Sequence, residues 1–323
     1  MTDALDAPAS PGRRPAAALF DLLPFRDLPL GRLPLAPGVA LPLPLGPLPG
    51  ARETSLGRIG SLEVRLARTV GEVRRCQKLR YRVFYEELGA VADGRTLVTG
   101  RDADRFDRVC DHMLVVDHES VEPRRFGRTG PRIVGTYRLL RQEAAARAGG
   151  FYTASEFDVA PLIARKPGLR FLELGRSCVL PEYRTKRTVE LLWHGVWAYV
   201  LRHRVDVMIG CASLEGTDPD RLALPLSFLH HHARADAEWR VSARPERAVA
   251  MNRLAREAVD ARRALQALPP LVKGYLRLGA MIGDGAVVDA QFGTTDVCMI
   301  LPVARISTRY VNYYGADASR HAA

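Results

Sequence analysis

The chain has 323 residues, of which 47% are hydrophobic and 26% charged, values typical of a globular protein with a substantial core. Its formal net charge of +11 favours anionic partners, such as an acidic protein or an anionic membrane surface. The aromatic platforms, basic zinc modules and recognition helices of nucleic-acid binders are missing from the sequence, so we expect no nucleic acid as a partner.

The five cysteines are widely spaced and include no C-x-x-C pair, which argues against a disulfide framework and a structural zinc site. Arg13-Arg14 resembles the start of an export signal, but Asp21 and Pro24 interrupt the apolar run that must follow. No stretch reaches the about 18 apolar residues of a spanning helix. We therefore expect a cytoplasmic protein that is not integral to a membrane.

Residues 1–58 form a lead rich in proline and leucine. Half of the 22 prolines fall in residues 8–49, and each lacks a backbone N–H and has a fixed φ. A disordered tail is the first interpretation of this segment. The alternative is a segment that touches a membrane, because it carries the apolar residues Leu22, Leu23 and Phe25.

Regular structure is predicted from about residue 60 onward. Alternation of apolar and charged residues predicts a strand over 62–66, and apolar residues at helical spacing predict a helix over 72–88 that Gly89 ends. Further strands are predicted over 112–117, 133–139 and 170–180. The exposed face of the predicted helix is basic, which suits either plain solvation or the docking of a partner.

A strand, loop, helix and strand follow one another in the middle of the chain. The loop is predicted over 181–187, the helix over 188–204 with Thr188 as its N-cap, and the second strand over 205–211. Such a unit presents free backbone N–H groups at the start of the helix, where phosphate groups bind. The remaining predicted elements are a helix from about 219 to 232, a helix over 273–280 and a strand over 297–303.

Four spaced elements with charged side chains are the candidates for chemistry. They are Arg80-x-x-Val83-Phe84, Asp104-x-x-Asp107, Gly135-Thr136-Tyr137-Arg138 and Glu173-x-x-Arg176. Glu173 and Arg176 stand in a strand that is otherwise almost fully apolar. Because an unpaired buried charge costs several kcal/mol, the two residues belong either to an internal ion network or to a site.

In order and spacing these elements resemble the acyl-homoserine-lactone synthases, which belong to the GNAT-like acyltransferases. Over about residues 60–312 the chain resembles more closely the L-ornithine N-alpha-acyltransferases. The segments that carry this resemblance are Leu79–Glu87, Phe171–Arg187 with its Glu-Leu-Gly-Arg-Ser-Cys core, Cys211–Pro219 and Leu268–Ala280.

The resemblance implies a GNAT-like α/β fold, with a mixed, mostly antiparallel sheet and helices on both faces. The domain is expected over 59–312, with a core over about 60–215, a C-terminal extension over about 216–312 and a tail over 313–323. The phosphopantetheine arm of the acyl donor is expected where the strands over 170–180 and 205–211 diverge. The residues expected to contact this arm are Val179, Leu180, Arg184, Lys186, Arg187, Thr188 and Cys211.

The loop at residues 184–189 departs from the general GNAT pattern R/Q-x-x-G-x-G/A. It keeps Arg184 but has Arg187 and Val189 in place of the two glycines, so a close approach to a diphosphate is not expected. A single phosphate, met by Arg184, Lys186 and Arg187, fits the loop better. We therefore expect acyl carrier protein as the donor, which is acidic, and no bound cofactor.

The resemblance implies transfer of a (3-hydroxy)acyl group to the α-amino group of L-ornithine, at the cytoplasmic face of a membrane because the product is a lipid. Glu173 is the candidate base, and amide groups near Val179 and Leu180 are candidates to stabilise the oxyanion. Arg138 or Arg176 is expected to bind the substrate carboxylate, and Asp104 or Asp107 its side-chain ammonium. Glu173 and Arg176 are thus the predicted catalytic pair, and the predicted substrate-binding set is Arg80, Asp104, Asp107 and Arg138.

Other interpretations stay open at this stage. The chain is alternatively an N-acyl amino acid synthase with another acceptor, an acyl-homoserine-lactone synthase, or a basic binding protein with an inactive acyltransferase fold. A metal site at the run 230–232 is not expected, since three consecutive histidines on a helix cannot converge on one ion. Cys178 and Cys211 are expected to be packed side chains rather than nucleophiles.

Overall fold

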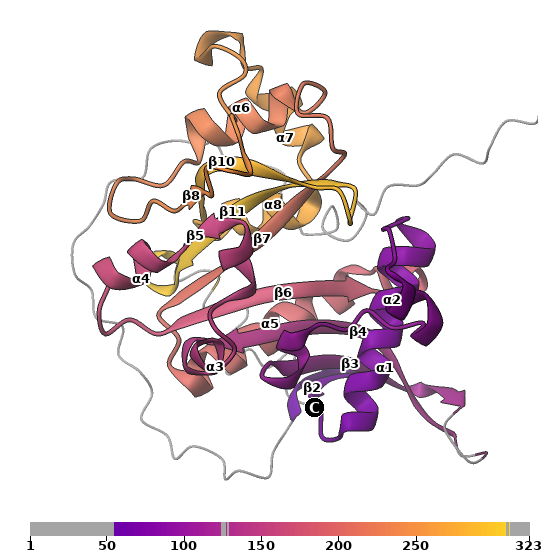
Figure 1. The fold of residues 1–323 in the computed structure, drawn as a ribbon. Helices are drawn as coiled ribbons and strands as arrows, with labels where there is room; N and C mark the ends of the chain where they lie inside the picture. Colours follow the sequence, from indigo (N-terminus) through magenta and orange to yellow (C-terminus); the bar gives the residue numbers. More distant parts are fainter. Residues whose placement is uncertain (1–54, 124–126, 128, 308–309, 311–323) are drawn as a thin grey trace, which may run out of the picture.

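An eleven-stranded sheet runs through the structure, a computed structural model that describes residues 55–123, 127, 129–307 and 310 (Figure 1). The strand order is β1-β2-β3-β4-β6-β7-β11-β10-β8-β5, with β9 paired to β10. All pairs are antiparallel except β6 with β7 and the short contact of β10 with β8. The strands are β1 (Ser55–Ile59), β2 (Leu62–Leu66), β3 (Asp111–Pro123), β4 (Thr129–Arg141), β5 (Phe157–Asp158), β6 (Phe171–Val179), β7 (Val207–Glu215), β8 (Ser242–Ala243), β9 (Ala248–Val249), β10 (Met281–Asp289) and β11 (Thr294–Pro302).

Helices connect these strands and cover the sheet. The α-helices are α1 (Val70–Tyr81), α2 (Gly94–Thr99), α3 (Gln142–Arg147), α4 (Ala160–Arg165), α5 (Lys186–His203), α6 (Ala223–His232), α7 (Ala261–Ala267) and α8 (Pro270–Arg277). A π-helical segment, η2 (Arg82–Glu87), continues α1. The described residues also include five short 3₁₀ turns: η3 (Arg105–Arg108), η5 (Tyr152–Ser155), η6 (Pro181–Tyr183), η7 (Arg256–Ala258) and η8 (Val303–Arg305). In the part of the chain that the structure describes, none of the helices combines the length and the apolar character that crossing a bilayer requires.

Helices lie on both faces of the sheet, as expected. The side chain of Cys76 in α1 contacts Thr136 of β4, while the hydroxyl of Tyr137, the next residue of β4, bonds to that of Tyr275 in α8. Because neighbouring residues of a strand point to opposite faces, α1 and α8 cover opposite faces. Trp193 of α5 packs edge-on against Tyr275, with ring centroids 5.6 Å apart, which places α5 on the same face as α8.

The strands β6 and β7 diverge, and this divergence is the feature that positions the site. Their parallel pairing joins Phe171–Glu173 to Val207–Ile209 and extends no further. Beyond this point β6 stays paired with β4, and β7 with β11 (Figure 1). At the branch a side chain on Gly210 would place its Cβ 2.4 Å from the carbonyl oxygen of Leu174. Glycine is therefore required where the two backbones come closest. The predicted divergence of these two strands is confirmed.

A β-bulge distorts β6 beside the divergence. In the pairing of β4 with β6, Arg138 lies opposite Gly175 and Thr136 opposite Cys178, so two residues of β6 lie opposite one residue of β4. Arg176, inside the bulge, has a φ of 51°, a left-handed conformation that costs a non-glycine residue about 1–2 kcal/mol. Bulges turn a strand and redirect its side chains, and they recur next to active sites.

The start of α5 differs from the prediction. Its N-cap is Thr185, whose side chain accepts a hydrogen bond from the amide of Thr188, and the helix begins at Lys186. Thr188 is therefore not the N-cap: it occupies the first turn and is fully buried. The predicted helix over 72–88 is confirmed, but in two parts, because its second half, η2, is π-helical. Single π-helical turns are often found at functional sites.

The domain boundaries also differ in detail. Strand β1 begins at Ser55, inside the predicted lead of residues 1–58, and pairs with β2. Residues 1–54 and 311–323 lie outside the described residues, and with them the predictions for Leu22, Leu23 and Phe25. The expected C-terminal extension belongs to the main sheet, since β11 pairs with β7 along its whole length, from Thr294 opposite Glu215 to Pro302 opposite Val207.

Candidate active site

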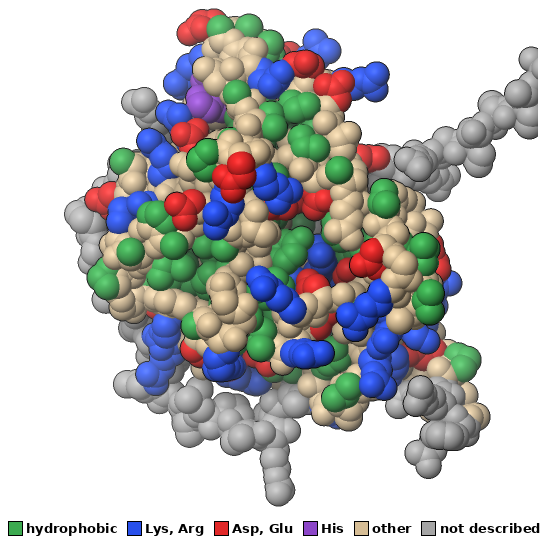
Figure 2. All heavy atoms as spheres, viewed as in Figure 1, with side chains coloured by type: hydrophobic (Ala, Val, Ile, Leu, Met, Phe, Trp, Pro, Cys, Tyr) green, Lys and Arg blue, Asp and Glu red, His purple; other side chains and the backbone are tan. Residues whose placement is uncertain are grey.

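A cavity of about 1070 Å³ opens where β6 and β7 separate. It is walled by β6 on one side, by β7 and β11 on the other, and by η2 and the segment 266–273 at its ends. In Figure 2 the surface is hollowed between the part with β10 and α6 and the part with α1, and charged side chains of both signs border the hollow. Six of the predicted site residues line the cavity: Arg138, Glu173, Arg176, Val179, Arg184 and Cys211.

Glu173 lies at the branch of the sheet and is only 4% exposed. Its Oε2 accepts a hydrogen bond from the amide of Tyr152 (2.9 Å), and its Oε1 accepts bonds from the amide of Thr153 (2.6 Å) and from the Thr153 hydroxyl. Burial raises the pKa of Glu173, and the hydrogen bonds from Thr153 and Tyr152 oppose this without cancelling it. A carboxylate offers about four lone-pair sites, so three donors leave about one site free.

Arg80 is almost completely buried and pairs with two aspartates. Its Nε lies 2.7 Å from Oδ2 of Asp102, and its Nη2 lies 2.9 Å from both carboxylate oxygens of Asp107. Asp107 also accepts a hydrogen bond from Gln77. Burial raises the pKa of Asp107, but the charge of Arg80 and its hydrogen bond, with the charges of Arg138 and His112, together lower it to about 2. Arg80 and Asp107 thus pair behind the cavity wall and are not among the residues that line the cavity.

The same ion network includes two arginines that do line the cavity. Nη1 of Arg138 lies 2.6 Å from Oδ2 of Asp104, and Nε of Arg176 lies 3.4 Å from Oδ2 of Asp102. Asp104 also caps the turn η3 by accepting bonds from the amides of two of its residues. The four predicted charged elements therefore meet in space, joined by Asp102, which the sequence analysis missed. Three arginines and three aspartates of this network balance in charge.

Arg176 lines the cavity and lies between two aromatic rings. Its guanidinium carbon lies 4.9 Å from the ring centre of Tyr152 and 4.4 Å from that of Phe292. Its Nε is buried and forms an ion pair with Asp102, without a hydrogen bond. A guanidinium that lines the cavity between two rings is suited to bind a carboxylate.

The loop before α5 carries the residues predicted to meet the carrier arm. Arg184 is held by two bonds to Glu87 (2.5 and 2.6 Å), and its Nε donates to the carbonyl of Val179 at 3.0 Å. Lys186 is partly exposed and Arg187 is exposed. The first-turn amides of Lys186 and Arg187 have no helical acceptor, as at any helix start.

Two of the predicted carrier contacts are placed differently. The amide of Leu180 donates to the carbonyl of Val134 at 2.9 Å, so it is not free to stabilise an oxyanion, and this prediction is wrong. Because successive peptide groups of a strand point to opposite edges, the amide of Val179 points away from β4. The buried hydroxyl of Thr188 bonds to that of Thr185 and is turned away from the loop surface.

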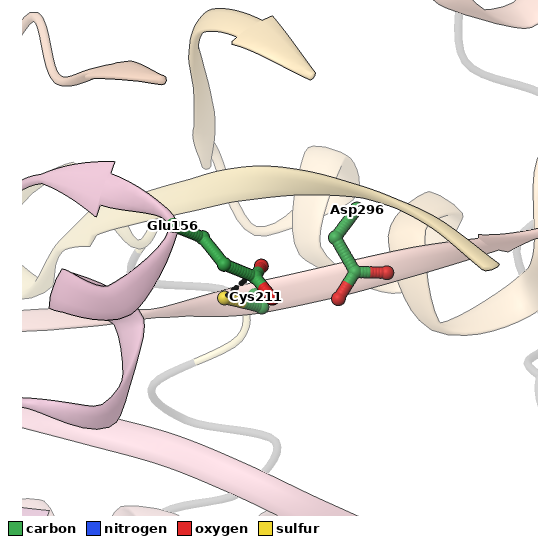
Figure 3. Close-up of side chains that lie close together, drawn as sticks. All are labelled: Glu156, Cys211 and Asp296. Atoms are coloured by element: carbon green, nitrogen blue, oxygen red, sulfur yellow. Dashed lines mark hydrogen bonds between the residues drawn. The ribbon is translucent and has the colours of Figure 1, made fainter. Parts of the chain in front are cut away.

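An acidic cluster at the opposite wall, of which Cys211 and Asp296 line the cavity, was missed by the sequence analysis. Glu156, after η5, Cys211 of β7 and Asp296 of β11 point toward one another, and their ligand atoms all lie within 4.8 Å (Figure 3). The thiol of Cys211 donates to Oε2 of Glu156 at 3.4 Å. Burial and the neighbouring Glu156 raise the pKa of Cys211 well above its ordinary value, which disfavours the thiolate and any nucleophilic role. The three residues are far apart in the sequence, so no local motif marked them.

The fold and the site define a class, that of the GNAT acyltransferases. Residues 79–194 match the family described as "Acetyltransferase (GNAT) domain". The chain is 58% identical over 265 residues to the L-ornithine N(alpha)-acyltransferase of Rhizobium meliloti (strain 1021), a match that covers 82% of this chain and 88% of the relative. It is 42% identical over 254 residues to the protein of the same name from Rhodobacter capsulatus, covering 79% and 95%. The chain therefore belongs to the L-ornithine N(alpha)-acyltransferase family, and the predicted family membership is confirmed.

Solved structures of similar fold include an N-acyl amino acid synthase from uncultured soil microbes, FeeM. It is 12% identical, with a TM-score of 0.40 and coverage of 75% of this chain and 91% of its own. Another is the acyl-homoserine-lactone synthase LasI, also 12% identical, with a TM-score of 0.43 and coverage of 79% and 96%. These two likenesses concern the fold alone.

Proposed function

We propose that the protein transfers a (3-hydroxy)acyl group from an acyl carrier protein to the α-amino group of L-ornithine. The acceptor follows from the name of the relatives, which are 42% to 58% identical over most of the chain. The observation that carries the proposal is the cavity at the branch of β6 and β7, because Glu173 and Arg176 both border it. An acyl thioester and an amino acid must meet in such a space, shielded from water.

The reaction needs a base, since an α-amine with a pKa of about 8 is largely protonated at neutral pH. Glu173 is the proposed base, directly or through a water molecule, because burial raises its pKa toward the useful range. The deprotonated nitrogen attacks the thioester carbonyl carbon, a C–N bond forms and the C–S bond breaks. The proton taken by Glu173 passes to solvent, and the carrier thiolate takes up a proton and leaves as a free thiol.

Arg176 and Arg138 are the proposed ligands of the substrate carboxylate. Both line the cavity, and the guanidinium of Arg176 lies there between the rings of Tyr152 and Phe292. The carboxylate would then lie near the bulge of β6, beside the proposed base. The cost of the left-handed conformation of Arg176 is consistent with a functional position.

The proposed donor is acyl carrier protein rather than coenzyme A. Lys186, Arg187 and the first-turn amides of α5 provide a site for a single phosphate, whereas the glycines that let a diphosphate approach the backbone are replaced. The guanidinium of Arg184 is engaged by Glu87 and fixes the loop at the cavity wall. The net charge of +11 supports an acidic protein as the donor.

The protein is proposed to carry out the reaction in peripheral contact with an anionic membrane. Four large apolar residues in and before α2 are exposed: Leu88 (39%), Val91 (66%), Leu97 (61%) and Val98 (89%). Leu88 also lines the cavity, so this apolar patch reaches the cavity wall. A product with a long acyl chain would leave more easily into a bilayer than into water.

The experiment that tests the proposed function mixes the purified protein with a 3-hydroxyacyl carrier protein and single amino acids. Release of free thiol and the mass of the product are measured. The proposal expects transfer to ornithine and not to glycine or homoserine. Transfer to another amino acid alone identifies a different N-acyl amino acid synthase, and no transfer to any amine leaves a binding protein. Replacing the acyl carrier protein by the matching acyl coenzyme A tests the donor, and the proposal expects much slower transfer.

Membrane contact is tested by sedimentation with vesicles that contain phosphatidylglycerol. The double variant Leu97→Glu, Val98→Glu is expected to lose most vesicle binding while it keeps transfer to ornithine in solution. Since both side chains are exposed, the fold is expected to tolerate the change. Wild-type sedimentation of the variant would remove α2 from the proposed contact.

A further inference from the structure

Two carboxylates, those of Asp296 and Asp289, line the cavity wall opposite Arg176, and the carboxylate of Glu156, which is not part of the lining, lies within 4.8 Å of Asp296. Glu156 is 2% exposed and Asp296 is 6% exposed, and they approach each other beside Cys211 (Figure 3). Asp289, at the end of β10, lines the same cavity and destabilises the charged form of both neighbours. The three carboxylates come from three separate segments of the chain, and the fold brings them together near the branch of the sheet.

This group has too few positive partners within the described residues. Nη1 of Arg247 lies 3.7 Å from Oε1 of Glu156, and Asp296 and Asp289 form no ion pair there. Asp296 accepts a hydrogen bond from the hydroxyl of Thr294 at 2.8 Å, and Asp289 accepts two backbone amides. Hydrogen bonds from neutral donors leave the negative charge in place. A cavity wall with this surplus calls for a cation or for a bound proton.

The arginines across the cavity supply the missing charge only in part, because burial raises the pKa of Asp296 and the charge of Arg176 opposes this without cancelling it. Arg80, Arg138 and Arg176 are matched by the three aspartates of their own network. The cavity therefore has positive charge on one wall and negative charge on the other. Guanidinium donors lie on the wall of β4 and β6, and carboxylate acceptors lie on the wall of β7, β10 and β11. A molecule with a carboxylate at one end and an ammonium at the other matches this arrangement.

We propose that Asp296 binds the side-chain ammonium of the amino acid acceptor, with Glu156 and Asp289 strengthening the negative potential around it. The inference rests on the proposed function and assigns a specificity-determining residue to it. Asp296 takes the place of Asp104 and Asp107, which were predicted for this contact but already pair with Arg138 and Arg80. Removing one charge-assisted hydrogen bond is expected to weaken binding of the amino acid acceptor about 10- to 100-fold.

The pH dependence of binding follows from the groups around Glu156. These are Cys211 from β7, Asp296 from β11, Asp289 from β10 and Arg247 from the segment before β9. Burial and the neighbouring Asp296 raise the pKa of Glu156 to about 7, and burial also raises the pKa of Asp296. Protonation of the pair at lower pH removes the charge that holds the ammonium. The KM for ornithine is therefore expected to fall as pH rises from 6 to 8.

The test compares ornithine with norvaline, which has the same carbon chain but no side-chain ammonium. Acyl transfer to both acceptors is measured with the full chain and with the variant Asp296→Asn. The variant is expected to raise the KM for ornithine at least tenfold, with a smaller change in kcat, and to leave norvaline unchanged or improved. The matched control is Asp284→Asn, which changes a partly exposed aspartate of β10 that pairs with Arg234 and should leave the kinetics with ornithine unchanged.

Two results would overturn the inference: an equal loss for both acceptors, or wild-type kinetics with ornithine in the Asp296→Asn variant. If that variant fails to fold, Glu156→Gln replaces it and must show the same selective rise in KM. Failure of the proposed function is distinguishable, because the wild-type protein would then transfer nothing to ornithine. Calorimetry with Zn²⁺ alone gives the remaining outcome: tight ion binding that Asp296→Asn removes, with ornithine kinetics unaffected, would identify a metal site instead.

Discussion

Replacing Glu156 by glutamine should stabilise the protein at alkaline pH. Glutamine has the shape of a protonated glutamate, so the contact with the Cys211 thiol is kept while the charge is removed. Burial, with the repulsion of Asp296, raises the pKa of Glu156 from an ordinary value of 4.5 to about 7. Between these two pH values the folded protein holds the proton more tightly than the unfolded chain, so stability falls as pH rises.

The size of the effect follows from the two pKa values. Each pKa unit corresponds to 1.36 kcal/mol, so the buried charge of Glu156 costs on the order of 3 kcal/mol once pH exceeds about 7. Below the ordinary pKa of a glutamate the cost disappears. The variant is therefore expected to exceed the wild-type protein in stability by up to about 3 kcal/mol at pH 8, and by little at pH 5.

Urea denaturation followed by circular dichroism at pH 5 and pH 8 measures this difference. The matched control is Glu72→Gln. Burial raises the pKa of Glu72, but the hydrogen bonds from Arg65 and Arg68 and the charges of Arg65 and Arg75 together lower it below 4.5, so its charge stabilises the fold above that pH. The control should therefore lose stability by similar amounts at pH 5 and pH 8. A Glu156→Gln variant that is less stable than the wild-type protein at pH 8 would refute the charge surplus on which the acceptor site is built.

Three further predictions concern the network, the base and the branch. Arg80→Met leaves two buried aspartates with only their longer ion pairs to Arg176 and Arg138, and should cost about 3–5 kcal/mol in urea denaturation; a loss below 1 kcal/mol would contradict the buried network. Glu173→Gln should keep binding of the acyl carrier protein in calorimetry but lower kcat about 10²- to 10⁴-fold, and wild-type turnover would exclude Glu173 as the base. Gly210→Ala should lower the stability by about 1–3 kcal/mol, because its Cβ meets the carbonyl of Leu174, whereas Gly175→Ala, with free space around it, should cost less; equal losses would contradict the close approach at the branch.

The elements that the sequence predicts well are those with a strong local pattern. Apolar residues at helical spacing identified α1, and the apolar run around Glu173 identified β6. Even there the details depend on tertiary structure. The bulge at Arg176 arises from the pairing with β4, and the N-cap of α5 is Thr185 because its hydroxyl reaches the amide of Thr188. Both residues can serve as N-caps by type, so only geometry decides.

The carrier-binding side of the site was predicted in part. The family resemblance placed Arg184 near the cavity, and the structure adds its anchor, Glu87, which lies 97 residues away in the sequence. The prediction for Leu180 failed because hydrogen bonding within a sheet depends on which edge each amide faces. That edge depends on the bulge of β6, which no local pattern announces.

The acidic wall was not predictable from the sequence. Glu156 follows a short turn, and Asp296 follows two threonines at the start of β11, so each looks like an isolated charged residue. Their proximity depends on the pairing of β11 with β7, which sets Asp296 opposite Ser213 and Cys298 opposite Cys211. Asp102 escaped notice for a similar reason, because its partners Arg80 and Arg176 come from distant segments.

The position of the acyl group on the product tests the central claim most directly. Ornithine has two amino groups. Its side-chain ammonium is proposed to bind Asp296, and its α-amine is proposed to lie beside Glu173. Tandem mass spectrometry of the product from wild-type protein, acyl carrier protein thioester and ornithine should find the acyl group on the α-nitrogen alone, with one free thiol for each product. Acylation of the side-chain nitrogen, or a mixture of the two products, would contradict the account.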